Sequence, residues 1–156
     1  MNKELVKEFV DSQPIKVVTK LDLDKEKLEY DRIVQCQKRT DAKPEELCRT
    51  YLLTKLVNEL GYAPERIEIE HEYTAGRPHT ITSRIDVIVR DANGDAFLFV
   101  EVKNPEEYAT IDKDSVIEEQ LFKLAGMERT EGHDVKYLVL YTKMMPLVRS
   151  MMNVSS

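Results

Sequence analysis

The pattern of apolar and polar residues predicts two long helices in the middle and second half of the chain. Between residues 44 and 60, apolar side chains recur at spacings of three to five, which makes one amphipathic stripe. Gly61 then stands where a left-handed helix cap is usual. A second stripe runs from Ser115, where Ser-Val-Ile-Glu matches a capping box, to Gly132.

Four other segments have the alternation or the continuous apolar run of β-strands. They are residues 67–70, 81–90, 96–103 and 135–141. The Asn-Gly pair between the second and third segments is the strongest short hairpin signal. Because a helix links the third strand to the fourth, that connection is a crossover and the sheet should be mixed. The predicted fold class is therefore α/β, with a mixed central sheet flanked by helices.

The first part of the chain has a weaker pattern. Residues 1–43 are rich in charge, and we expect a helical and extended lead-in that packs on the core. Within it the pattern indicates a helix at residues 4–11, a strand at 15–19 and a helix at 24–38. Residues 44–145 form the predicted core, and residues 146–156 have no pattern, as in a tail or linker.

Composition narrows the class of protein. With 156 residues, of which 42% are apolar, the chain can bury a hydrophobic core without the help of disulfides or a structural metal. Two cysteines make no disulfide framework and the first residues resemble no signal peptide, so we expect a cytoplasmic protein. No run approaches the ~20 apolar residues of a membrane span. The net charge of −6 disfavours a stand-alone nucleic-acid binder, but metal sites use carboxylates, so a nuclease stays open.

The predicted hairpin brings four charged residues into register. If the Asn-Gly pair is central in the turn, Asp86 lies opposite Glu101 and Arg84 lies opposite Lys103. Residues two apart on a strand share a face, so these four side chains should cluster. The opposite face should carry Ile85, Val87, Val100 and Val102.

Two opposed carboxylates repel each other unless a proton, a cation or a divalent metal accommodates them. Glu101 and Lys103 also end the most apolar strand, where charges are costly unless they are paired or bound to metal. Carboxylate oxygens suit Mg²⁺ or Mn²⁺, and Lys103 could orient or deprotonate a water or stabilise charge on a phosphorane. The pattern indicates metal-assisted phosphodiester hydrolysis. The alternative is a structural or exposed cluster, because Asp-x(14)-Glu-x-Lys arises by chance in acidic chains.

These residues resemble a known active-site signature. Ile85-Asp86 followed by Glu101-Val102-Lys103 is similar to the motif of the PD-(D/E)xK nucleases, with Ile85 in place of the proline. Over roughly residues 40–125 the chain resembles the N-terminal nuclease region of type I restriction enzyme R subunits. The runs that carry this resemblance are 43–49, 60–62, 68–70, 83–89 and 100–105.

The resemblance implies a restriction-endonuclease-like fold and a metal-dependent endodeoxyribonuclease. Asp86 and Glu101 would hold Mg²⁺ or Mn²⁺, with the Val102 carbonyl as a further candidate ligand. Lys103 would be the catalytic lysine.

Three further residues are weaker candidates for the site. Glu46 matches the acidic residue that many members supply from the first helix, although an acid is ordinary in a first helical turn. Glu70 is a second acidic candidate. Gln120 matches the start of a Gln-x-x-x-Tyr motif, but Leu124 stands in the tyrosine position.

Arg77 and Arg84 could contact DNA phosphates, or they could be ordinary surface cations.

The chain lacks the Gly-x-x-x-x-Gly-Lys-Ser/Thr loop of an ATP-driven motor, so we expect no ATP site here. The implied partners are double-stranded DNA and modification or specificity subunits, or a motor domain outside this chain, and no membrane. Two alternatives stay open: a catalytically silent module for assembly or DNA tethering, and a structure-specific DNA repair nuclease.

Overall fold

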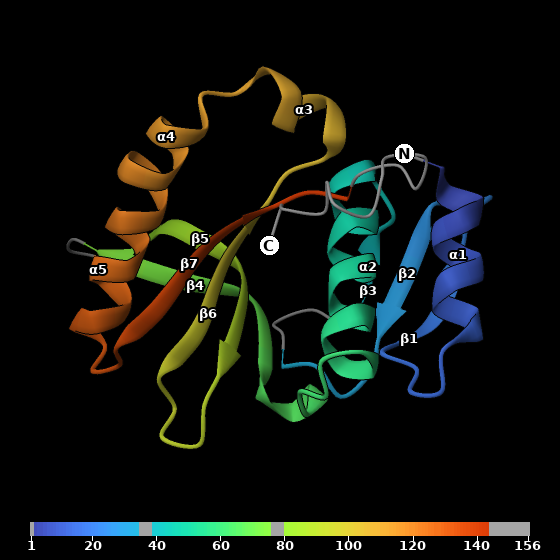
Figure 1. The fold of residues 1–156 in the computed structure, drawn as a ribbon, viewed down its shortest axis with the longest axis horizontal. Helices are drawn as coiled ribbons and strands as arrows, with labels where there is room; N and C mark the ends of the chain where they lie inside the picture. The colour runs from blue at the N-terminus through green and yellow to red at the C-terminus, as the bar shows by residue number, and fades with distance from the viewer. Residues whose placement is uncertain (1, 35–38, 76–79, 144–156) are drawn as a thin grey trace.

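The computed structural model describes residues 2–34, 39–75 and 80–143, which form two sheets and their covering helices (Figure 1). In chain order the elements are α1 (Lys3–Ser12), β1 (Val18–Asp22), β2 (Lys27–Tyr30), β3 (Arg39–Asp41), α2 (Pro44–Asn58), η1 (Pro64–Arg66), β4 (Ile67–Ala75), β5 (Thr80–Arg90), β6 (Ala96–Val102), α3 (Pro105–Thr110), α4 (Lys113–Ser115), η2 (Val116–Leu121), α5 (Phe122–Thr130) and β7 (Val135–Tyr141). Among these described residues, no helix combines the length and hydropathy needed to cross a membrane.

The main sheet has four strands in the order β4-β5-β6-β7. Its first two pairings are antiparallel, and β6 pairs with β7 in parallel after the crossover through α3, α4, η2 and α5. Helix α2 packs on one face of this sheet and the η2–α5 helix on the other (Figure 1). The predicted α/β class, with a mixed central sheet flanked by helices, is therefore confirmed.

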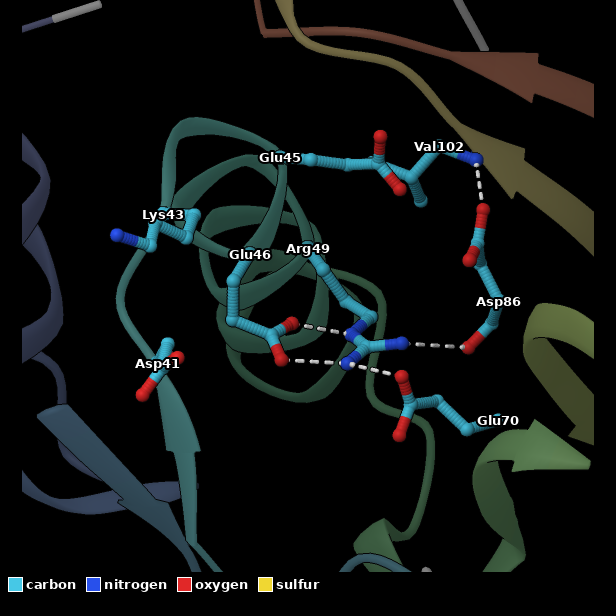
Figure 2. Close-up of a pocket in the computed structure, with 8 residues that line it drawn as sticks. All are labelled: Asp41, Lys43, Glu45, Glu46, Arg49, Glu70, Asp86 and Val102. Carbon is cyan, nitrogen blue, oxygen red and sulfur yellow. Dashed lines mark hydrogen bonds and ion pairs between the residues drawn. The ribbon is translucent and has the colours of Figure 1, made fainter.

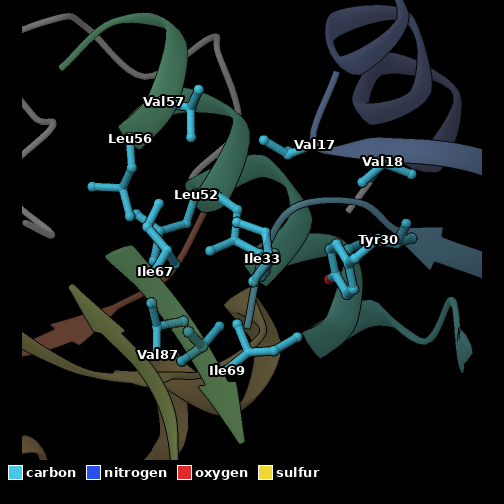
Figure 3. Close-up of a cluster of buried hydrophobic side chains, with 14 of the residues drawn as sticks. Val17, Val18, Tyr30, Ile33, Leu52, Leu56, Val57, Ile67, Ile69 and Val87 are labelled. Atoms are coloured by element: carbon cyan, nitrogen blue, oxygen red, sulfur yellow. The ribbon is translucent and has the colours of Figure 1, made fainter. Parts of the chain in front are cut away.

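The larger core lies between α2 and the main sheet (Figure 3). Leu52, Leu56 and Val57 of α2 meet the buried residues of β4 and β5 there. The core continues to α1 and to the small antiparallel sheet β1-β2-β3. The predicted helix at residues 44–60 is confirmed as α2, and Gly61 has the expected positive φ of 76°.

Near the N-terminus one prediction is confirmed, one is displaced and one is wrong. The helix expected at residues 4–11 is α1, and the strand expected at 15–19 lies at β1. The helix expected at 24–38 is wrong, because β2 occupies part of it and Leu28 and Tyr30 are buried with the period of a strand. Residues 35–38 of that segment lie outside the described residues.

The β5–β6 hairpin has the predicted register at the site but a different turn. Val87–Val100, Ile88–Phe99 and Val89–Leu98 pair as expected. Nearer the turn, Arg90 pairs with Ala96, and the Gly94 N–H donates to the Asp91 carbonyl at 3.1 Å. The Asn-Gly pair is therefore the end of the turn rather than its centre. The irregularity between Val89 and Arg90 compensates for this shift, so the strands beyond it keep the predicted pairing.

Strands β4 and β5 change which face their side chains occupy. Ile69 and Val87 lie in the α2 core, whereas Ile85 lies in the core under α5. The expectation that Ile85 shares a face with Val87 is therefore wrong. The change falls at Glu70, whose φ of +53° is uncommon for a residue with a side chain. The β4–β5 pairing also passes from Ile69–Val87 to His71–Ile85 without a pair between them.

The second long helix begins earlier than predicted. Asp112, rather than Ser115, caps it by accepting a hydrogen bond from the Ser115 N–H at 3.3 Å. The helix then passes through the π-helical segment η2 into α5 and ends before Gly132. The short helix α3 was not predicted because none of its residues is buried, so it has no apolar stripe. The last predicted strand, at residues 135–141, is confirmed as β7.

A network of charged side chains lies between α5 and the main sheet. Glu128 is fully buried and accepts hydrogen bonds from the Tyr73 hydroxyl at 2.6 Å and from Arg90 at 2.7 Å. Arg90 also donates to Glu68 of β4 at 2.9 Å. This network ties α5 to β4 and β5 through bonds to charged groups, which are stronger than neutral ones.

The charge of His71 should make the stability of the domain depend on pH. The carboxylate of Glu68, then that of Glu131, raises the pKa of His71 from 6.5 to about 9 although burial opposes the shift. The protonated ring stabilises the fold fully below pH 6.5, and this contribution is lost as pH rises through about 9. From about pH 6.5 to about pH 9.5, we expect wild type to lose about 1–2 kcal/mol more unfolding free energy than His71→Gln. Equal losses in urea unfolding of the two proteins would contradict this.

Candidate active site

The candidate site is a cavity of about 230 Å³ between the N-terminal end of α2 and strands β4, β5 and β6 (Figure 2). Its lining residues are Asp41, Lys43, Glu45, Glu46, Arg49, Glu70, Asp86 and Val102. Five of these side chains are carboxylates and two are cations. The cavity therefore concentrates negative charge next to the main sheet.

Asp86 and Glu101 lie on the neighbouring strands β5 and β6, as the hairpin register predicted. The backbone N–H of Val102 donates to Asp86 Oδ2 at 2.7 Å, which fixes the orientation of this carboxylate. Lys103 Nζ lies 3.5 Å from Glu101 Oε1, and both side chains are mostly buried, at 13% and 12% exposed. The structure thus brings together the three residues on which the sequence interpretation chiefly depends.

Burial makes this pair of acids hard to ionise. Removal from water is the main cause that raises the pKa of Asp86. The same effect, followed by repulsion from Asp86, raises the pKa of Glu101 to about 8, against the attraction of Lys103. Near neutral pH the pair therefore keeps a proton unless a cation replaces it. Such a paired shift is typical of functional carboxylates.

Lys103 carries a positive charge at this site. Burial would lower its pKa, but the carboxylates of Glu101 and Glu107 outweigh this effect and the pKa is raised. Glu107 of α3 lies 3.3 Å from Lys103 Nζ. The raised pKa favours a lysine that orients a water or stabilises negative charge over one that removes a proton.

Glu46 is already occupied by neighbours. Arg49 donates to both of its carboxylate oxygens at 2.5 Å, and the Tyr30 hydroxyl donates to it at 3.1 Å. Glu46 and Arg49 are both buried, at 8% and 5% exposed. Arg49 also donates to the Asp86 carbonyl at 3.4 Å and lies 3.5 Å from Glu70. Sequence reasoning missed Arg49, although its i, i+3 spacing from Glu46 signals an ion pair on one helix.

Glu45 is the acidic residue of α2 that extends toward Asp86 and Val102 (Figure 2). Burial, followed by repulsion from Asp86, raises its pKa to about 6. Sequence reasoning chose Glu46 instead. The i, i+3 spacing of Glu46 and Arg49 is the sequence signal that could have directed attention to Glu45, since that ion pair engages both carboxylate oxygens of Glu46 although both glutamates line the cavity.

The remaining candidates lie elsewhere. Gln120 is exposed on η2. Arg84 does not pair with Lys103 as expected, because the β5–β6 pairing stops at Val87–Val100. Arg84 is 54% exposed and forms an ion pair with Glu72 at 3.3 Å. Arg77 lies outside the described residues.

The carboxylates at one edge of the cavity, where Asp86 lines it and Glu101 lies next to Asp86 on β6, fit a hard divalent cation. Asp86 and Glu101 offer carboxylate oxygens, which Mg²⁺ and Mn²⁺ prefer, and their raised pKa values mark a place where added positive charge is favourable. A second group, His71, Glu128 and Glu131, also places ligand atoms within 4.8 Å of one another. It fits a metal poorly, because the raised pKa of His71 keeps its ring protonated near neutral pH.

Fold and site together define a restriction-endonuclease-like domain, with two carboxylates and a lysine on a β-hairpin beside an acidic helix. The sequence model of the type I restriction enzyme R protein N terminus matches residues 44–127, just over half of the chain, and the chain belongs to this family. The match runs from the start of α2 into α5 and includes Asp86, Glu101 and Lys103. No curated protein matches the sequence.

Replacing Glu101 should stabilise the metal-free domain at high pH. The folded protein holds a proton that the unfolded chain releases between pH 4.5 and about pH 8, so stability falls over this range. In EDTA near pH 8.5, we expect Glu101→Gln to raise the unfolding free energy by about 1–3 kcal/mol, with no gain near pH 4. The exposed neighbour Glu106→Gln is the control, with a change within about 0.5 kcal/mol. A loss of stability in Glu101→Gln near pH 8.5 would count against the raised pKa.

Proposed function

We propose that this domain is a metal-dependent DNA endonuclease, the nuclease part of a type I-like restriction-modification system. One observation carries the proposal: the buried Asp86–Glu101 pair, with Lys103 Nζ 3.5 Å from Glu101, within the family match. Buried charges of one sign cost free energy, so a purely structural role gives no reason to retain them. A site that takes up a cation does give such a reason.

Asp86 and Glu101 are the residues that would hold Mg²⁺ or Mn²⁺. The bond from the Val102 N–H engages Oδ2 of Asp86, so this carboxylate keeps one orientation. The Val102 carbonyl is a further candidate ligand, since Val102 lines the cavity. A bound Mg²⁺ would supply positive charge that activates a water and offsets charge on the phosphate.

Lys103 and Glu45 are the side chains that would act on the reacting groups. The protonated amine of Lys103 can orient the water or stabilise charge that develops on the phosphate. Glu45 has a pKa of about 6, so near pH 7.5 it is ionised and can accept a hydrogen bond from the water. Glu46, held by Arg49, supports the cavity wall instead.

DNA binding would depend on partners outside this chain. The net charge is −6 and the cavity itself is acidic, so phosphate contacts supplied by this chain would be few. Arg84 is the candidate contact that the structure describes, and Arg77, the other candidate from the sequence, lies outside the described residues. We therefore propose double-stranded DNA as substrate, presented by specificity and modification subunits or by a motor domain.

Metal binding and plasmid nicking test the proposal. By calorimetry with Mn²⁺, we expect Asp86→Asn and Glu101→Gln to weaken binding by about 100-fold or more, because each removes a ligand charge. Lys103→Met should keep the metal and lose nicking by about 100-fold or more. Lys113→Met, on the same connection but stacked on Tyr108, is the matched control. Wild type that neither binds Mn²⁺ nor nicks DNA would instead support the silent module for assembly or DNA tethering.

A second pair of variants tests the assignment to α2. Glu45→Gln should lower the nicking rate by about 10- to 100-fold, because the water loses an ionised acceptor. Glu59→Gln, at the far end of the same helix and 49% exposed, should leave the rate unchanged. If Glu45→Gln nicks plasmid DNA at the wild-type rate, Glu45 has no part in the chemistry.

A further inference from the structure

We propose that Arg49 is a positioning residue, which sets the place of Asp86 and thereby the affinity of the site for a divalent cation. This inference rests on the proposed function, because Asp86 needs an accurate position only if it holds a metal. Arg49 itself would not touch the metal or the substrate. It acts through the backbone of Asp86 and through the carboxylate of Glu70.

One guanidinium joins three elements of the fold (Figure 2). Arg49 leaves α2 and is held by two hydrogen bonds of 2.5 Å to Glu46, one turn earlier on the same helix. Its remaining nitrogen reaches the Asp86 carbonyl of β5 at 3.4 Å, and it lies 3.5 Å from Glu70 of β4. The two hydrogen bonds to Glu46 orient the planar guanidinium of Arg49, so its position is determined by α2.

The two residues that Arg49 contacts on β4 and β5 belong to the irregular part of the main sheet. Glu70 has a φ of +53°, and the β4–β5 pairing omits Glu70 and Asp86 between Ile69–Val87 and His71–Ile85. Such conformations persist only where the surroundings hold them in place. Irregularities of this kind redirect side chains beside active sites. Arg49 is a buried side chain that contacts both strands at this point, so it is a group that can hold them in place together with the Val102 N–H.

The sign of the effect on metal binding separates positioning from charge. A positive charge near the cavity repels a divalent cation, so a purely electrostatic role predicts tighter binding once Arg49 is removed. Positioning predicts weaker binding, because the backbone of Asp86 loses one of the contacts that place it. A role in stability alone predicts no change in the affinity of the molecules that are folded.

Mn²⁺ calorimetry on the full chain tests the inference, with urea unfolding as a check that each variant is folded. Arg49→Lys keeps the positive charge and loses the planar guanidinium, and Arg49→Met removes both. We expect each to raise the Kd for Mn²⁺ by about 10- to 100-fold, the usual effect of losing a group that orients a ligand. Lys55→Met, on the same helix and paired with Glu59, is the control with unchanged Kd. If Arg49→Met does not fold, Arg49→Lys decides the question alone.

The variant Asp86→Asn distinguishes a failure of this inference from a failure of the proposed function. If Asp86→Asn loses Mn²⁺ and Arg49→Lys binds it as tightly as wild type or more tightly, the inference is overturned and the proposed function stands. If Asp86→Asn binds Mn²⁺ as wild type does, the metal site itself is wrong and the inference falls with it.

Discussion

The main physical constraint on the structure is that two acidic groups, Asp86 and Glu101, are held side by side and largely away from water. Their raised pKa values mean that this arrangement opposes folding once both are ionised. The surroundings offset this cost from several directions: the Val102 N–H and Lys103 bind the carboxylates, and Arg49 binds the Asp86 backbone. Two hydrophobic cores, one on each face of the main sheet, supply the remaining stability. A site of this kind is typical of proteins in which function and stability conflict.

Much of the fold could be predicted because its strongest elements have strong periodic patterns. Helix α2 has a continuous apolar stripe, and the crossover between β6 and β7 follows from a helix between two strands. The register from Val87–Val100 to Val89–Leu98, next to Asp86 and Glu101, was predicted although the turn was not, because the irregularity beside Arg90 compensates for the shifted turn. Helix α3 and strand β2 were missed for one reason, since a short element shows too few buried positions to reveal its period.

The residues that surround the centre of the site were harder to predict than the residues at the centre itself. Asp86, Glu101 and Lys103 lie on one hairpin, so spacing along the chain brings them together. Glu45 and Arg49 reach the same place only through the packing of α2 on the sheet. The positive φ of Glu70 has no sequence signal at all, because the residue is neither glycine nor asparagine. The family match includes all of these positions, but it does not show which of the two glutamates that line the cavity is engaged by Arg49.

The connection from β6 to the η2–α5 helix has a consequence for how such domains can differ. All of α3 and α4 belongs to the described part of the chain, and neither helix buries a side chain. This connection begins directly after Lys103 and stands beyond the end of β6 (Figure 1). Residues could therefore be inserted or exchanged there without disturbing either core. This segment next to the site can thus vary without a change in the scaffold, as long as Glu107, which pairs with Lys103, is kept.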